Sequence, residues 1–362
     1  MHFRRGFQVG LATVLAGGLV AACNSNTNTS EPGAGASSGA AAANPLIGVD
    51  FPRSDTDFWN AYIKYVPTMA KELGVETKTT NSQNDVATLA SNVTTMVSQN
   101  VKGIVMAPQD TAAIAPTLAQ LDAKKIPVVT IDTRPDAGKV FMVVRADNRA
   151  YGTKACQYLG AKLGGKGKVV MLMGGLDSIN GRDRTEAFNE CMKKDFPGIT
   201  VFGEATEWKG DVAAAKLQTR LTSDPDVKGI YMQASFALAG TINILKQKGL
   251  NVPATDPKHV YVVSNDGIAE ELKNIKDGLI DATVSQPADL FAKYGLFYAK
   301  AAIAGQTFKP GPTDHDSNII QVREGLLEDQ LAAPLVTLDG GKYGSEQSVK
   351  FDDKSLWGNS AS

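Results

Sequence analysis

"VKGIVMAP", residues 101–108, and "VKGIYMQA", residues 227–234, are identical at five of eight positions. Each is a short β-rich run that follows one amphipathic stretch and precedes another, and each is the third such run in its half of the chain. Self-similarity of this kind indicates two structurally alike halves. A match of this length also arises by chance, so the interpretation depends on the runs around it.

Short β-rich runs alternate with amphipathic stretches from residue 46 onward, and the series starts twice. Strands and helices in regular succession are typical of a parallel sheet covered by helices. The sequence therefore predicts an α/β fold with two similar doubly wound, Rossmann-like domains. The first series has runs at 46–51, 75–80, 103–108, 127–132 and 139–144, with helical stretches at 57–73, 85–99 and 112–124. The second has runs at 166–174, 199–205, 227–234, 259–265 and 281–286, with helical stretches at 148–163, 182–194, 210–222 and 236–249.

The length and charge of the chain fit this division and exclude one class of partner. A single hydrophobic core rarely grows beyond roughly 250 residues, so 362 residues allow two domains. The formal net charge is -1, and no block of Lys and Arg is long enough to suggest a nucleic-acid patch. Nucleic acid is therefore not an expected partner.

The N-terminus reads as an export signal. "MHFRR" is basic, residues 6–20 are apolar, and "VAAC" ends at Cys23 after two small residues, which resembles a bacterial lipobox. We predict a lipoprotein signal peptide at 1–22 and lipidation of Cys23; an ordinary secretory cleavage site is the alternative. Residues 23–44 are small or polar and predict a flexible tether, so the protein is expected outside the cytoplasm, anchored to the cell membrane.

Two further cysteines, Cys156 and Cys191, lie in the exported part of the chain. Disulfides persist in oxidising compartments, so one bridge between two helices is favoured over two separately buried thiols. The three histidines are far apart in the sequence, and no zinc-like ligand spacing occurs. We predict neither a metal site nor a cofactor.

Polar and aromatic side chains follow the predicted strands of both halves. Strand ends of open α/β sheets border the ligand cleft. Carboxylates accept from hydroxyls, guanidinium groups donate in a fork, amides do both, and aromatic faces cover C–H surface. This mixture suits a compact polyhydroxylated ligand, although single residues can instead cap helices, form surface ion pairs or belong to the core. The candidates are Asp57, Phe58, Trp59, Asp132, Thr133, Asn180, Arg184, Trp208, Gln233, Asp266 and Gln286.

Catalysis has little support in the sequence. There is no G-x-S-x-G elbow, no H-E-x-x-H, and no histidine among the strand-end residues. "GGKGKV" at 164–169 precedes a strand, whereas a phosphate loop follows one. A weaker alternative to ligand binding is glycoside hydrolysis, with Asp132 and Asp266 as the two catalytic carboxylates.

Residues 45–322 resemble the type I solute-binding proteins of bacterial sugar ABC transporters, the ribose-binding-protein-like group. The motifs that carry the resemblance are "FW" after the first strand, "PVVTID", "RADN", "GRDRTEAF", "NDG" and "ATVSQ", in this order. Position by position, the resemblance implies a ligand set of Phe58, Trp59, Asp132, Arg184, Trp208, Asp266 and Gln286. Thr133 stands where the ribose group has Arg, and Ala234–Ser235 where it has Asn–Asp. Changed hydrogen-bonding partners imply a changed ligand, so a polyol, another pentose, a hexose or a cyclitol is expected, with a polyol favoured.

The resemblance also implies an architecture and a mode of action. Three strands of the hinge would cross between the domains near Ala146, after Gln286 and near Asn318. The domains would then comprise 45–146 plus 287–317 and 147–286 plus 318–340, followed by a tail at 341–362. Closure around the ligand would present the protein, as a monomer, to an ABC permease and its ATPase. A sensing module that feeds a signalling receptor shares every one of these features and remains an alternative. A secreted carbohydrate-active enzyme is a further alternative with less support.

Overall fold

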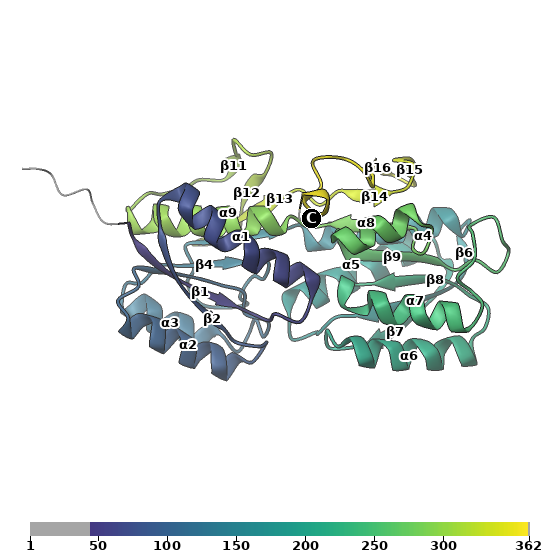
Figure 1. Cartoon of the computed structure of the whole chain (residues 1–362), viewed down its shortest axis with the longest axis horizontal. Coiled ribbons are helices and arrows are strands. Elements are labelled where there is room, and N and C mark those ends of the chain that lie inside the picture. The colour runs from purple at the N-terminus through teal and green to yellow at the C-terminus, as the bar shows by residue number, and fades with distance from the viewer. Residues whose placement is uncertain (1–43, 361–362) are drawn as a thin grey trace, which may run out of the picture. The chain divides into compact units, whose positions relative to one another are not determined.

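The computed structural model describes residues 44–360 and contains two α/β domains, each built on one mixed, eight-stranded sheet (Figure 1). The predicted signal peptide, the lipidation site at Cys23 and all but the last residue of the predicted tether lie outside the described residues. Among residues 44–360, no helix combines the length and the apolar character needed to cross a bilayer.

The first sheet combines six parallel strands with an antiparallel edge. The parallel strands are β1 (Leu46–Phe51), β2 (Glu76–Asn81), β3 (Gly103–Met106), β4 (Val128–Ile131), β5 (Met142–Ala146) and β13 (Leu326–Leu331), and the edge strands are β11 (Gly311–Pro312) and β12 (Asn318–Arg323). Their order in the sheet is β11-β12-β13-β5-β4-β3-β1-β2. β3, β4 and β5 are buried throughout, as expected of parallel strands covered on both faces.

Four helices cover this sheet, two on each face. α1 (Asp57–Leu73) and α9 (Ala288–Ile303) pack together on one face, and α2 (Val86–Ser98) and α3 (Ala115–Ala123) lie on the other (Figure 1). α1 begins where the side chain of Thr56 accepts a hydrogen bond from the backbone N–H of Trp59. It ends at Gly74, whose left-handed φ of 61° is readily available to glycine. These two caps fix the position of Phe58 and Trp59 in the first turn of α1.

The second sheet repeats the order of the five central parallel strands of the first, but β14 joins β10 antiparallel whereas β13 joins β5 parallel. Its strands are β6 (Lys166–Met173), β7 (Gly198–Ala205), β8 (Val227–Met232), β9 (Tyr261–Asp266), β10 (Ala282–Ser285), β14 (Leu335–Thr337), β15 (Lys342–Tyr343) and β16 (Glu346–Lys350), in the order β15-β16-β14-β10-β9-β8-β6-β7. The two octapeptides fall on β3 and β8. β3 pairs with β1 and β4, and β8 pairs with β6 and β9, so the repeated segments occupy equivalent places in the two sheets.

The helices of the second domain are α4 (Asn148–Lys162), α5 (Ile179–Asp195), α6 (Gly210–Ser223), α7 (Leu238–Gln247) and α8 (Ala269–Lys276). α4 packs on α5, and α6 packs on α7. A disulfide joins Cys156 of α4 to Cys191 of α5, with their Cα atoms 6.2 Å apart, as the sequence predicted. The disulfide therefore links α4 to α5, the first two helices of the second domain.

The chain passes between the sheets three times, but the third passage differs from the expectation. It crosses after β5, after β10, and between β13 and β14. The predicted third crossing near Asn318 is wrong, because β12 and β13 form an antiparallel pair whose second strand joins β5. Residues 318–331 thus belong to the first sheet, whereas the sequence placed them in the second domain.

The described part of the predicted tail at 341–362 is folded onto the second domain. β16 pairs with β14, which pairs with β10. The chain then runs to a short 3₁₀ helix, η2 (Trp357–Asn359). The segment ends at the junction of α1 and α8, where the yellow end of the ribbon lies in Figure 1.

Candidate functional site

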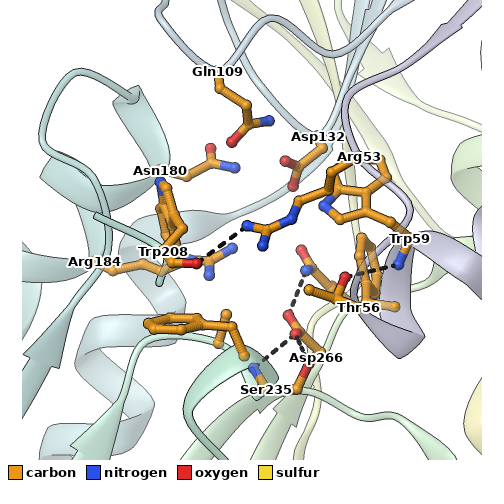
Figure 2. A pocket seen from close by; sticks show the side chains of 14 residues that line it. Arg53, Thr56, Trp59, Gln109, Asp132, Asn180, Arg184, Trp208, Ser235 and Asp266 are labelled. Atoms are coloured by element: carbon orange, nitrogen blue, oxygen red, sulfur yellow. Dashed lines mark hydrogen bonds between the residues drawn. The ribbon is translucent and has the colours of Figure 1, made fainter. Parts of the chain in front are cut away.

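A cavity lies between the two domains, at the ends of the parallel strands (Figure 2). About 40 Å³ of it is available to the centres of water-sized molecules, whereas one buried water needs roughly 10–15 Å³. Open α/β sheets bind ligands at this edge, beyond the carboxyl ends of their strands. The cavity is lined by Arg53, Thr56, Phe58, Trp59, Gln109, Asp132, Asn180, Arg184, Trp208, Ala234, Ser235, Phe236, Asp266 and Gln286.

Asp132 follows β4 and is buried, with a left-handed backbone φ of 61°. Its Oδ1 has no hydrogen-bond partner among residues 44–360, and such an orphaned acceptor is costly unless something donates to it. Burial raises the pKa of this carboxyl to about 6, although the positive charges of Arg184 and Arg145 oppose the shift. The Asn180 side chain also opposes the shift, so Asp132 has one polar neighbour in the cavity, while its Oδ1 accepts no hydrogen bond from the described residues.

Asp266 ends β9 and is satisfied by the protein. Its Oδ2 accepts from the backbone N–H of Ser235 at 2.8 Å and from the Ser235 hydroxyl at 2.5 Å, while its Oδ1 accepts from Nε2 of Gln286 at 2.7 Å. Burial raises the pKa of Asp266, and the charge of Arg184 opposes this. Three donors therefore fix the orientation of this carboxylate at the opposite side of the cavity from Asp132 (Figure 2).

Arg184, on α5, brings a buried guanidinium to the cavity. Its Nε donates to Oδ1 of Asn148 at 2.7 Å, its Nη1 donates to the carbonyl of Gln233, and its Cζ lies 4.8 Å from the centre of the Tyr151 ring. These contacts hold the fork in one orientation. The guanidinium therefore faces the cavity without freedom to swing away.

Asn180, at the start of α5, is oriented by a charge behind it. Nη2 of the buried Arg145 donates to Oδ1 of Asn180 at 2.7 Å and to Oδ2 of Asp183 at 3.0 Å. Since the amide oxygen is occupied, the NH₂ group is the part of Asn180 that remains for a ligand. Figure 2 shows this amide group facing Asp132.

Aromatic rings close the cavity from both domains. Phe58 and Trp59 stand edge to face with their centroids 5.1 Å apart, and Trp208 and Phe236 form a similar pair at 5.8 Å. Both rings of the first pair are also part of the hydrophobic core. They thus serve as core on one side and as cavity wall on the other.

The glycine pair after β6 makes room for Trp208. A Cβ on Gly174 would lie 2.1 Å from the Trp208 ring, and one on Gly175 would lie 2.9 Å from its Nε1. Only residues without a side chain allow the indole to pack this closely on the backbone. The "GG" at this strand end thus has a packing role, and Trp208 itself adopts a φ of 59°.

Three of the predicted site residues do not line the cavity. Asp57 is exposed and lies on an outer groove between α1 and α8, while Thr133 is buried behind Asp132. Gln233 lies below the site, where its Oε1 accepts from the Gly174 N–H at 2.9 Å and its carbonyl receives Arg184. Gln233 therefore supports the site without facing its interior.

Six lining residues were not predicted: Arg53, Thr56, Gln109, Ala234, Ser235 and Phe236. Arg53 lies in the loop between β1 and α1, pairs with Asp55 at 2.5 Å, and reaches the carbonyl of Trp208 at 3.2 Å. Gln109 follows β3, so the strand-end rule applied to that strand would have found it. Arg53 lies in an irregular loop and gave no periodic signal.

Further contacts join the domains near the cavity. Nη2 of Arg182, on α5, donates to Oδ1 of Asp136 at 2.6 Å and to the hydroxyl of Thr111 at 3.1 Å. The backbone N–H of Thr111 also donates to the carbonyl of Asp177 at 3.2 Å. Asp136 and Thr111 belong to the first domain and the other two residues to the second, so these bonds hold the domains together around the cavity.

Comparison with known proteins identifies the family. The model of the periplasmic binding protein domain matches residues 47–307. A xylitol-binding protein of Mycolicibacterium smegmatis is 29% identical over 247 residues, which are 68% of each chain. The ribose import binding protein of Bacillus subtilis is 26% identical over 260 residues, 72% of this chain and 82% of that one.

Solved structures share the fold. A solute-binding protein of an ABC transporter from Mycobacterium smegmatis, with bound glycerol, matches with a TM-score of 0.68 at 23% identity over 74% of this chain and 90% of that one. A counterpart from Actinobacillus succinogenes, with bound D-allose, gives a TM-score of 0.71 at 19% identity over 81% and 98%. With the sheet order and the family match over most of its length, the chain belongs to the periplasmic binding protein family, whose members compared here are transport receptors rather than enzymes.

Proposed function

We propose that this protein is the extracytoplasmic receptor of an ABC importer for a small, neutral, polyhydroxylated solute, and that a polyol is its ligand. One observation carries the proposal: Asp132 lines the cavity and has a buried carboxylate oxygen, Oδ1, without a hydrogen-bond partner among residues 44–360. A ligand hydroxyl supplies the missing donor. Asp132, Asn180, Arg184, Asp266 and Gln286 would then bind hydroxyls.

The charges of the cavity favour a ligand without net charge. Two arginines, Arg53 and Arg184, and two aspartates, Asp132 and Asp266, line it, so the formal charges cancel. Because Arg53 already pairs with Asp55, an anionic ligand would meet two buried carboxylates and only the guanidinium of Arg184. The rings of Phe58, Trp59, Trp208 and Phe236 would cover the C–H surface of the ligand.

One feature favours a polyol over a pyranose sugar. The place of the strand-four arginine in the ribose-type group is taken by Thr133, and the next arginine, Arg134, pairs with Glu328 at 2.8 Å instead of entering the cavity. A relative named for xylitol binding, at 29% identity, is in keeping with this choice.

Ligand identity is tested by thermal unfolding of the full chain in the presence of xylitol, ribitol, glycerol, D-ribose, D-allose, myo-inositol and amino acids. A ligand at about 100 times its Kd adds ~2.7 kcal/mol to the free energy of unfolding, so binders raise the Tm measurably. We expect the largest rise with a polyol. A rise with amino acids alone would contradict the proposal.

We further propose that the receptor is a monomer held to the cell membrane through lipid on Cys23, with residues 23–44 as spacer, and that it delivers its ligand to a permease and its ATPase. The support is the N-terminal sequence and the family. Mass spectrometry of the membrane-derived protein should find a diacylated Cys23 as the first residue, and C23A should shift the protein to the soluble exported fraction. An unmodified Cys23 in wild type would refute the anchor.

A further inference from the structure

The C-terminal segment of the chain extends beyond the matched family domain, which ends at residue 307, and it returns to the cavity. β14 and β16 attach the segment to the second sheet, and η2 then brings Trp357 to the junction of the two domains. Trp357 is buried, with 4% of its surface exposed. Its ring contacts a residue of each domain, and both residues line the cavity.

On the second domain, Trp357 holds the backbone of Asp266. Its Nε1 donates to the Asp266 carbonyl at 3.1 Å, and the same carbonyl accepts from the Gln286 N–H at 3.0 Å. Asp266 has a φ of 121°, a conformation that side-chain-bearing residues rarely adopt. A Cβ on Gly358 would lie 2.2 Å from the Gly267 carbonyl, so the segment packs directly on this turn. The indole N–H therefore helps to hold a strained residue in place.

On the first domain, Trp357 contacts Phe58. The two rings stand edge to face with centroids 5.8 Å apart and an interplanar angle of 80°. Phe58 in turn contacts Trp59 at 5.1 Å. Because Phe58 belongs to α1 and Asp266 to β9, one side chain of the tail joins an aromatic wall of the cavity to a carboxylate of the opposite wall.

We propose that Trp357 is a positioning residue that stabilises the closed arrangement of the two domains and thereby raises ligand affinity. This inference rests on the proposed function, because closure of the domains raises affinity only if it encloses a ligand. If the domains rotate apart, the segment stays with the second domain through β16 and Gly358. The ring of Trp357 then leaves Phe58, and both rings gain exposure to water. Trp357 thus favours closure before any ligand binds.

A favoured closed state increases affinity without touching the ligand. The apparent Kd equals the intrinsic Kd divided by the fraction of molecules in the binding-competent state. An edge-to-face aromatic pair changes an equilibrium by roughly two- to tenfold. We therefore expect W357A to weaken binding on the order of tenfold, mainly through faster ligand dissociation, since opening precedes release.

The experiment measures opening directly in the full chain. Spin labels on non-natural amino acids at Lys124 and Lys248, exposed residues of the first and second domain, report the interdomain distance by pulsed electron resonance and leave the disulfide intact. Without ligand, W357A should show a larger population of long distances than wild type. W357F keeps the aromatic edge on Phe58 and should restore the short distances. F351L alters another aromatic of the tail and serves as the matched control; Phe351 packs on the core.

The outcomes separate this inference from the proposed function. If wild type binds no polyol, the proposed function fails, while the ligand-free distances still decide the role of Trp357. With xylitol as the probe, a weaker Kd and faster dissociation for W357A, rescued by W357F, support the inference. Equal distance distributions in wild type and W357A overturn it. W357L, which retains apolar bulk, provides the same comparison should W357A fail to fold.

Discussion

Asp132 and Asp266 are both buried carboxylates at strand ends, yet they differ in the hydrogen bonds that they accept from the protein. Asp266 accepts three hydrogen bonds from Ser235 and Gln286, so the protein determines its orientation. Asp132 has an oxygen without a partner among the described residues. A buried acceptor of this kind gains most from a ligand donor, and we expect Asp132 to contribute the most to affinity of the two.

Replacement of the charge at Asp132 tests this. D132N keeps the size of the side chain but loses the ionic acceptor, and hydrogen bonds to charged groups correspond to about a 10- to 100-fold change in Kd. We expect D132N to weaken polyol binding by that factor at pH 8, measured by calorimetry. D122N, on the outer face of α3 where Asp122 pairs with Lys139, should bind as wild type does.

The pKa of Asp132 adds a pH dependence. Burial raises it to about 6 in the folded chain, above the ordinary value of 3.8, so the ligand-free folded state binds the proton more tightly. The stability of the ligand-free protein should therefore fall as the pH rises from about 4 to about 6, because the buried carboxyl then ionises. Binding should weaken below about pH 6, as the acceptor is protonated, and D132N should flatten this dependence. An affinity equal at pH 5 and pH 8 in wild type would count against Asp132 as an ionised acceptor.

Sequence reasoning located most of the residues that line the cavity, because strand ends converge at one edge. All seven residues implied by the family resemblance line the cavity: Phe58, Trp59, Asp132, Arg184, Trp208, Asp266 and Gln286. The rule fails for adjacent residues, because neighbouring side chains along the chain point in different directions, on a helix as well as in a strand. Thr133 follows Asp132 and is turned away, and Asp57 precedes Phe58 and faces outward.

At the scale of elements, α4 and α5 carry much of the second domain's half of the site. α5 supplies Asn180 and Arg184, and α4 supplies Asn148, which accepts from Arg184. The disulfide between Cys156 and Cys191 ties these helices away from the cavity. It should therefore affect stability more than the geometry of the binding groups.

Removal of the disulfide tests this separation. The bridge spans 35 residues, and the chain-entropy model gives a loss of about 3–4 kcal/mol in the free energy of unfolding when it is absent. We expect the C156A/C191A double variant to show this loss in denaturant titration and a polyol Kd within about twofold of wild type. Reduced wild type controls for the alanine cavities. A large loss of affinity at unchanged stability would show that the bridge positions Arg184.

Elements were predicted well where they repeat and poorly where they do not. The parallel strands and most of their helices follow the alternation of the sequence, although α8 and α9 were not predicted. β3 and β8 occupy the equivalent places that the repeat predicted. The region after residue 310 has no such alternation. Its strands β12 and β13 form a local antiparallel pair, but the place of β13 in the sheet depends on its pairing with β5, which is distant in sequence. This is why the third crossing was placed too early and why the return of the tail was not foreseen.

At the scale of the whole molecule, the domains are joined by three chain crossings and by polar contacts near the cavity. Arg182 contacts Asp136 and Thr111 across the domains, and the backbone N–H of Thr111 donates to the carbonyl of Asp177. Such contacts break when the domains separate, so they slow opening without touching a ligand. They differ in this from the groups that line the cavity.

Two arginines of the second domain allow a matched comparison. R182Q removes an ion pair between domains, whereas R149Q removes pairs of Arg149 with Glu186 and Glu190 inside the second domain. Half-exposed pairs are worth about 0.2–1 kcal/mol, so R182Q should speed ligand dissociation by up to about fivefold in stopped-flow measurements. The effect should shrink at high salt. R149Q should leave dissociation unchanged, and equal rates for the two variants would argue against the contact as a restraint on opening.

The positive φ angles of the site bear on any redesign of the receptor. Asp132, Trp208 and Asp266 adopt φ values of 61°, 59° and 121°, which few side chains tolerate. New residues at these positions would alter the backbone along with the chemistry. Arg53, Gln109 and Ala234 line the same cavity without this constraint. A library that varies these three positions is therefore the practical route to receptors for other polyols, and thus to biosensors built on this scaffold.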